Sequence, residues 1–222
     1  MSSTKLNFLH VGKTGGTAII EAIREFPSAV YDIRTHPHDV SFSDIPRGDK
    51  IFFAVRDPVD RFVSGFYSRQ RLGAPRYNSP WSDDETIAFA TFPTANSLAE
   101  AISVPGDRGK EAEGAMTAIQ HVRTSFYDWF QSDEYFMNRL DDVLFIGEIR
   151  VLQTEFEALK ALIKLPIAAR LPDDDIRAHR NPAHVDRALS DLAKANLREW
   201  YAKDYDFYHL CGRIRAERGM AH

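Results

Sequence analysis

A glycine-rich stretch near the start of the chain has residue types that bind phosphate. Residues 12–17 read Gly-Lys-Thr-Gly-Gly-Thr and follow a short apolar run. Glycines let backbone N–H groups converge on an anion, and Lys13 adds a full positive charge. The alternative is a tight turn in which Gly15 and Gly16 only accommodate positive φ angles. A nucleoside-triphosphate loop, G-x-x-x-x-G-K-[ST], would need glycine at position 7, which is Asn7. The stretch therefore predicts an anion site whose spacing differs from that of the triphosphate loop.

A second stretch, IFFAVRDPVDRFVSGFY at 51–67, could hold another phosphate. Arg56 follows a predicted strand, and Asp57-Pro58 can cap and begin a helix. The polar side of that helix is predicted to be available to a ligand; it comprises Arg61, Ser64 and Ser68. A guanidinium and a serine hydroxyl that converge there would bind phosphate. Alternatively, Arg56 pairs with a neighbouring aspartate and Ser64 only fills the helix surface.

Two histidines could accept a proton. The stretch RTHPHDVSF supplies His36 and His38 directly after the second predicted strand. A histidine with an ordinary pKa of about 6.5 can act as a general base near neutral pH. His-x-His can also bind a metal, but no third or fourth ligand follows at a convincing spacing. The remaining alternative is a surface loop with two solvated histidines.

Together, the first two stretches resemble the cofactor-binding motifs of the sulfotransferases that use 3′-phosphoadenosine 5′-phosphosulfate (PAPS). In that family a K-T-G-G-T-type loop binds the 5′-phosphosulfate, and an R-x-P-x-x-R-x-x-S stretch binds the 3′-phosphate. The resemblance assigns the cofactor to two sets of residues. The 5′ side is assigned to Lys13, Thr14, Gly15, Gly16 and Thr17, and the 3′-phosphate to Arg56 and Ser64. Two motifs in the right order, on the expected elements, make this a specific match.

The sequence resembles most the subgroup that includes the uronyl 2-O-sulfotransferases and related carbohydrate enzymes. FIGEIRVLQTEFEAL and YAKDYDFYHL look like its last strand-helix unit and its C-terminal signature. That subgroup has its catalytic base in a histidine-rich stretch after the same strand, which favours His38 and leaves His36 open. The chain departs from the family at two positions, because Gly12 stands where proline is frequent and Ala18 where serine is frequent.

The resemblance implies transfer of a sulfuryl group from PAPS, with no required metal, to an acceptor hydroxyl on a carbohydrate. Lys13 would stabilise the departing oxygen, and His38 or His36 would take the acceptor's proton. Two other functions are weighed against this one. A nucleotide kinase or nucleoside triphosphatase is disfavoured by Asn7 and by the lack of a clear Mg²⁺-binding aspartate after an apolar strand. A non-catalytic module that binds a sulfated or phosphorylated ligand would be indifferent to the histidines.

Apolar runs alternate with helical patterns, which predicts an α/β fold: a P-loop-like, three-layer arrangement with a mostly parallel sheet flanked by helices. Strands are expected at 6–11, 29–33, 51–55 and 143–147. A helical insertion at 72–140 is expected to shape the acceptor site, with capping boxes formed by Ser82 with Glu85 and by Ser97 with Glu100. One long helix is expected at about 183–203. We expect a single domain over residues 1–222.

Composition limits the partners and the compartment. A net charge of −4 gives no global positive field for nucleic acid, so an anion must be bound locally. The single cysteine, Cys211, excludes an internal disulfide and favours a reducing compartment. No apolar run is long enough for a membrane span, and the first residues lack the pattern of a signal peptide, so we expect a soluble, cytoplasmic protein. The polar loop with Arg177, Arg180 and Asn181 is expected to be solvated, and the oligomeric state is not predicted.

Overall fold

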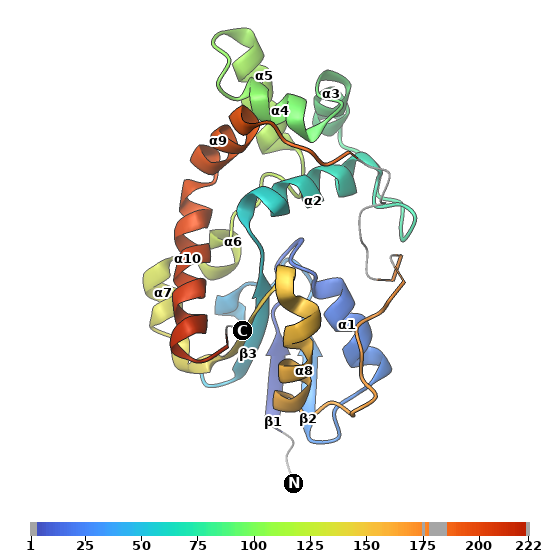
Figure 1. The fold of residues 1–222 in the computed structure, drawn as a ribbon, viewed down its shortest axis with the longest axis vertical. Helices are drawn as coiled ribbons and strands as arrows, with labels where there is room; N and C mark the ends of the chain where they lie inside the picture. Colours follow the sequence, from blue (N-terminus) through green and yellow to red (C-terminus); the bar gives the residue numbers. More distant parts are fainter. Residues whose placement is uncertain (1–3, 175, 178–185, 221–222) are drawn as a thin grey trace. The chain divides into compact units, whose positions relative to one another are not determined.

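The computed structural model describes residues 4–174, 176–177 and 186–220. The described residues form two compact units (Figure 1). We call them the sheet unit, drawn from Met1–Arg56, Phe126–His179 and Asp206–His222, and the helical unit, drawn from Asp57–Ser125 and Arg180–Tyr205.

The sheet unit contains a four-stranded parallel sheet, which confirms the predicted α/β fold. The strands are β1 (Thr4–Phe8), β2 (Tyr31–Thr35), β3 (Lys50–Val55) and β4 (Val143–Glu148), in the order β2-β1-β3-β4. Phe8 of β1 lies opposite Thr35 on one side and Phe52 on the other. All three pairings are parallel. All four strands were predicted, although β1 ends three residues before the expected Val11 and β2 starts two residues after the expected Ala29.

Both faces of the sheet are covered by helices, which gives the predicted three layers (Figure 1). On one face, alternate residues such as Phe8 and Phe52 pack against α1 (Gly16–Glu25) and α8 (Leu152–Leu162). On the other face, residues such as Phe53 pack against buried aromatic rings, because successive strand residues point to opposite sides. The elements that supply this second layer are η1 (Phe42–Asp44), α6 (Tyr127–Phe130), α7 (Asp133–Met137) and α10 (Ala202–Glu217). Two short 3₁₀ turns flank β4: η2 (Leu140–Asp142) and η3 (Ile149–Val151).

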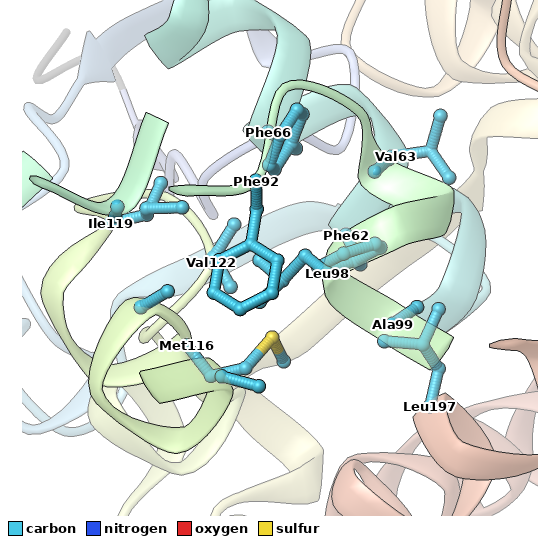
Figure 2. Packing of buried hydrophobic residues seen from close by; sticks show 14 of the residues in the cluster. Phe62, Val63, Phe66, Phe92, Leu98, Ala99, Met116, Ile119, Val122 and Leu197 are labelled. Carbon is cyan, nitrogen blue, oxygen red and sulfur yellow. The ribbon is translucent and has the colours of Figure 1, made fainter. Parts of the chain in front are cut away.

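The helical unit has its own apolar core. Its helices are α2 (Pro58–Gln70), α3 (Asp83–Thr91), α4 (Ala95–Ala101), α5 (Asp107–Ala118) and α9 (Asp191–Trp200). Phe62 and Phe66 of α2 contribute to a core with Phe92, Leu98 and Met116 (Figure 2). The apolar stripe of α2 is therefore the face that packs.

Helix caps in this unit agree with one sequence prediction and correct another. Ser82 and Glu85 form the predicted capping box at the start of α3. The box expected from Ser97 and Glu100 is wrong, because Thr94 caps α4 and its side chain accepts from the Ser97 N–H at 3.0 Å. Ser97 can serve as the third helical residue of such a box as well as its cap, and the sequence alone does not distinguish the two registers.

The prediction that the polar side of α2 is available to a ligand is wrong for Arg61 and Ser68, because both side chains are buried. Arg61 is 2% exposed and donates to the Thr124 carbonyl at 2.8 Å and to the Thr124 hydroxyl at 2.7 Å. Its guanidinium also lies 3.6 Å from the carboxylate of Asp204. Ser68 is fully buried, whereas Ser64 is half-buried. A buried charge with a carboxylate and a carbonyl around it belongs to the unit's own structure.

The C-terminal region also differs from the prediction. The single helix expected at 183–203 is wrong: α9 starts at Asp191 after Ser190, its cap, and a new helix, α10, starts at Ala202. The break falls at buried Tyr201, whose hydroxyl donates to the Val122 carbonyl at 2.7 Å. The stretch YDFYHL, residues 205–210, lies inside α10. Among the described residues no helix has the length and apolarity needed to cross a bilayer.

A buried ion pair joins α8 to α10 in the sheet unit and leads to a stability prediction. Glu155 pairs with Arg215, and both side chains are at most 8% exposed. Glu155 also accepts from the Glu148 N–H at 2.8 Å. Removing one partner leaves the other charge buried, so Glu155→Ala should lower the free energy of unfolding by about 3–5 kcal/mol in urea denaturation. The matched control is Glu157→Ala on the same helix: the Glu157 side chain is 64% exposed and its partner Lys160 keeps the Ile167 carbonyl as an acceptor, so the change should be about 0.5 kcal/mol or less. Equal losses for the two variants would contradict the prediction.

Candidate active site

The glycine-rich turn lies at the point of the sheet where ligands usually bind. The chain leaves β1 and goes to β2 on one side, and then to β3 on the other side of β1. A crevice opens beyond the carboxyl ends of strands at such a reversal. The turn at 12–17 follows β1, and Arg56 follows β3. The Arg56 guanidinium donates through Nη1 to the Lys13 carbonyl at 3.3 Å. Two of the residues predicted to bind cofactor phosphates are thus in contact.

The turn has a left-handed backbone at two positions. Lys13 has φ 66° and Gly15 has φ 84°. A Cβ at Gly15 would also collide with the Ile149 side chain of η3. Glycine is therefore required at 15, but lysine at 13 is strained, by about 1–2 kcal/mol for an L-residue in this region. Strain of this kind often accompanies function, which is consistent with a lysine whose charge is needed at this place.

The N-terminus of α1 offers backbone N–H groups to an anion. Gly15 is the N-cap residue, and α1 has no side-chain cap. The first N–H groups of a helix have no partner within the helix, and the helix dipole adds a partial positive charge there. Thr17 is half-buried in this first turn. Thr14 is fully buried and donates its hydroxyl proton to the Val11 carbonyl at 2.9 Å, so its hydroxyl shapes the turn. The arrangement can bind a phosphate mainly through the backbone.

His38 is held in a defined tautomer. Its Nδ1 lies 2.9 Å from the His10 carbonyl oxygen. A carbonyl only accepts, so Nδ1 carries the proton and Nε2 carries the lone pair of the neutral ring. Although His38 is an exposed residue, the protein atoms around its ring lower its pKa below 6.5, and the charge of Lys13 lowers it further. The His10 carbonyl and Asp39 act in the opposite direction. The net effect keeps His38 neutral and able to accept a proton near pH 7.

His36 is held by a different neighbour. Its Nε2 lies 2.9 Å from Oδ1 of Asn7, and the Asn7 amide nitrogen donates to the Lys50 carbonyl at 3.3 Å. Asn7 is 2% exposed, so the residue at the place of a triphosphate-loop glycine is a buried support for His36. Burial lowers the pKa of His36, and the charge of Arg34 lowers it further. The charge of Lys13 acts on His38 and is not among the causes for His36, which groups His38 with the turn.

His10 is the residue of this cluster that sequence reasoning missed. It is 8% exposed, and its ring packs against the His38 ring with centroids 3.8 Å apart and ring planes inclined by 39°. Burial, followed by His38 and then Lys13, lowers the pKa of His10 to about 3. A sequence feature that could have indicated His10 is an ionisable residue within the apolar run FLHV, residues 8–11. The run is predicted only as a strand, so His10 is not among the predicted site residues. Gly16 is needed beside it, since a Cβ there would collide with the His10 ring.

Trp129 forms a hydrogen bond with the backbone of His38. Its indole Nε1 donates to the His38 carbonyl at 2.9 Å. Trp129 is 5% exposed, and its aromatic neighbours in FYDWF belong to the core of the sheet unit, as expected for such a tract. A Cβ at Gly12 would lie 3.3 Å from the Trp129 ring. Gly12, which stands where the sulfotransferases that the sequence resembles frequently have proline, therefore packs against the Trp129 ring.

The other predicted residues are less closely connected to this cluster. Ser64 belongs to the helical unit, and its contact with a 3′-phosphate stays a prediction. Arg177 pairs with Glu25 at 2.6 Å at the surface of the sheet unit, whereas Arg180 and Asn181 lie outside the described residues. Within the described ranges, no group of three or more His, Cys, Asp or Glu residues is arranged to hold a metal ion.

Comparisons with known proteins were made on sequence and on structure. No family model and no curated protein matches the sequence. The structure is similar to the crystal structure of mouse sulfotransferase SULT7A1 complexed with PAP, at a TM-score of 0.43 and 14% sequence identity. The match covers 92% of this chain and 84% of that chain. Similarity at this level carries no argument about function, so the assignment rests on the residues of the site.

The strained lysine gives a prediction that separates stability from function. Lys13→Gly should raise the free energy of unfolding by about 0.5–1 kcal/mol in urea denaturation, because glycine adopts positive φ without strain. The same change removes the charge and should weaken binding of an anionic ligand. Lys164 is a matched control, since it is an exposed lysine with φ 55° and lies outside the turn. Lys164→Gly should raise stability similarly and leave ligand binding unchanged. A loss of stability in Lys13→Gly would show that the lysine supports the fold and would contradict the strain argument.

Proposed function

We propose that the protein is a PAPS-dependent sulfotransferase that transfers a sulfuryl group to a hydroxyl of a carbohydrate acceptor. One observation carries the proposal: a neutral histidine with its Nε2 lone pair stands within electrostatic reach of the lysine of a phosphate-type turn. Lys13 and His38 belong to the same unit, and the positive charge of one lowers the pKa of the other. A turn that only binds an anion has no need of such a base.

The donor fits the residues better than a nucleoside triphosphate does. PAPS supplies the sulfuryl group and has two separate phosphate ends. The amides of Gly16 and Thr17 at the start of α1 would bind the 5′ side together with the turn, whereas Thr14 would contribute its backbone N–H. Arg56, whose guanidinium already contacts the turn at the Lys13 carbonyl, would bind the 3′-phosphate with Ser64. Asn7 is used to hold His36, which supports a loop other than that of a triphosphatase.

The protein's own groups would act mainly through positioning and charge. His38 would accept the acceptor's proton at Nε2 while its Nδ1–H stays bonded to the His10 carbonyl. Lys13 would stabilise negative charge on the bridging oxygen as it departs, and the turn amides would hold the 5′ side in line. By analogy with phosphoryl transfer, a loose transition state needs this kind of stabilisation more than covalent catalysis. His36 is the alternative base and would accept the proton at Nδ1, because its Nε2–H is bonded to Oδ1 of Asn7.

The acceptor is proposed from the resemblance of two later stretches, FIGEIRVLQTEFEAL and YAKDYDFYHL, to the carbohydrate subgroup. We propose that residues 1–222 act as one catalytic domain, in which 72–140 contributes acceptor contacts.

Cys211 is free and buried, and burial raises the pKa of its thiol. An unreactive single thiol suits a reducing compartment, and we propose the cytoplasm.

The test is release of PAP from PAPS in the presence of unsulfated polysaccharides that contain uronic acid, measured across pH. Lys13→Ala and His38→Ala should each lower turnover by about 10² or more. In the wild type, kcat/KM should fall as the pH drops through the pKa of His38, which lies below its usual 6.5, because the protonated ring cannot accept a proton. His38→Ala should lose this acid limb.

His209→Ala is the control, since His209 is an exposed histidine of α10 outside the turn. It should retain wild-type turnover and the wild-type pH profile. Near-normal rates for both Lys13→Ala and His38→Ala would remove the proposed mechanism. If His36→Ala, and not His38→Ala, abolished the acid limb, the base would be His36.

A further inference from the structure

His10 contacts both halves of the proposed site. Its ring packs against the His38 ring with centroids 3.8 Å apart and ring planes inclined by 39°, and its carbonyl oxygen accepts from His38 Nδ1 at 2.9 Å. On the turn side, the ring lies directly against Gly16, the first residue of α1, where there is no room for a Cβ. One buried residue therefore touches the histidine and the first turn of the helix that would bind the 5′ phosphate.

The contacts of His10 restrict His38 in two ways. The carbonyl fixes which nitrogen carries the proton, and the His10 ring, with its centroid 3.8 Å away, limits rotation of the His38 side chain. The Trp129 indole, which donates to the His38 carbonyl, fixes the backbone on the other side. A base held in this way pays little entropy to reach its working orientation, and small displacements of such groups are costly to rate.

Burial is the largest influence on the charge of the His38 ring and lowers its pKa. The His10 carbonyl raises the pKa, Lys13 of the turn lowers it, and Asp39, next in the chain, raises it. The His10 ring itself stays uncharged at neutral pH, because burial lowers its pKa to about 3. It is therefore unsuited to proton transfer near pH 7 and suited to packing.

We infer that His10 is a positioning residue, whose ring and carbonyl hold His38 in one tautomer and orientation beside the phosphate turn. Its part in catalysis rests on the proposed function, whereas its hold on His38 does not. The chemical requirement is a flat, neutral ring at this position. Phenylalanine meets that requirement, and alanine does not.

The experiment compares His10→Ala, His10→Phe and the control His209→Ala by NMR titration of the His38 ring, which needs no donor or acceptor. His38→Ala identifies the signal. Loss of the His10 ring should expose the His38 imidazole, so His10→Ala should raise the measured pKa of His38 by about half a pH unit toward its usual value. His10→Phe and His209→Ala should leave it unchanged.

The activity arm uses PAP release from PAPS with the same variants. His10→Ala should lower turnover by about tenfold or more and shift the acid limb upward with the His38 pKa. His10→Phe should recover turnover to within about threefold of wild type. If His10→Ala does not fold, His10→Asn replaces it, since this side chain is neutral and lacks the ring.

The inference is overturned if His10→Ala, or His10→Asn in its place, leaves the His38 pKa and the pH profile unchanged. It is also overturned if His10→Phe changes the His38 pKa as much as His10→Ala does, because the ring would then not be the determinant. The proposed function fails separately, if the wild type releases no PAP from PAPS while the NMR titration still responds to the His10 variants.

Discussion

The close approach of the turn at 12–17 to the structure beneath it is the constraint on which the site depends. Gly15 lies against Ile149 and Gly16 against His10, and neither position has room for a Cβ. The turn therefore packs closely against the end of the sheet, and Lys13 has a left-handed conformation that L-residues rarely adopt. This packing brings the lysine, the start of α1 and the histidines into one place at the carboxyl edge of β1.

The electrostatics of the site follow from this packing. Burial of the imidazoles is the main reason that the pKa values of both His10 and His38 are lowered, and the charge of Lys13 lowers both further. The two rings then have different uses, because His10 is buried against the turn and His38 is an exposed residue. The same lysine can hold an anion and keep a nearby base unprotonated. A site for proton abstraction beside a phosphate needs that combination.

The sequence predicted the parts of the fold that follow from local pattern. The four strands came from apolar runs, and the caps at Asp57 and Ser82 came from side-chain chemistry within a few residues. It could not predict that Arg61 would be internal, because the groups that neutralise it, at Thr124 and Asp204, are far away in sequence. The break at Tyr201 has the same origin, since its hydroxyl partner is the carbonyl of Val122. For the site, residue types gave Lys13, His36, His38 and Arg56. The role of His10 could not be predicted in this way, because it depends on the contact of its ring with the His38 ring, and the two residues are 28 positions apart in the chain.

We propose that the turn at 12–17 binds a nucleotide with separate 3′ and 5′ phosphate groups. The most direct measurement is calorimetric titration of the metal-free protein with 3′-phosphoadenosine 5′-phosphate, with ATP plus Mg²⁺ as the competing ligand and Arg56→Ala as the comparison variant. We expect tight binding of 3′-phosphoadenosine 5′-phosphate without metal, weakened by about tenfold or more in Arg56→Ala, because a charge-assisted phosphate contact is lost. Binding of ATP only, and only with Mg²⁺, would contradict it and would mean that the turn is a variant triphosphate loop.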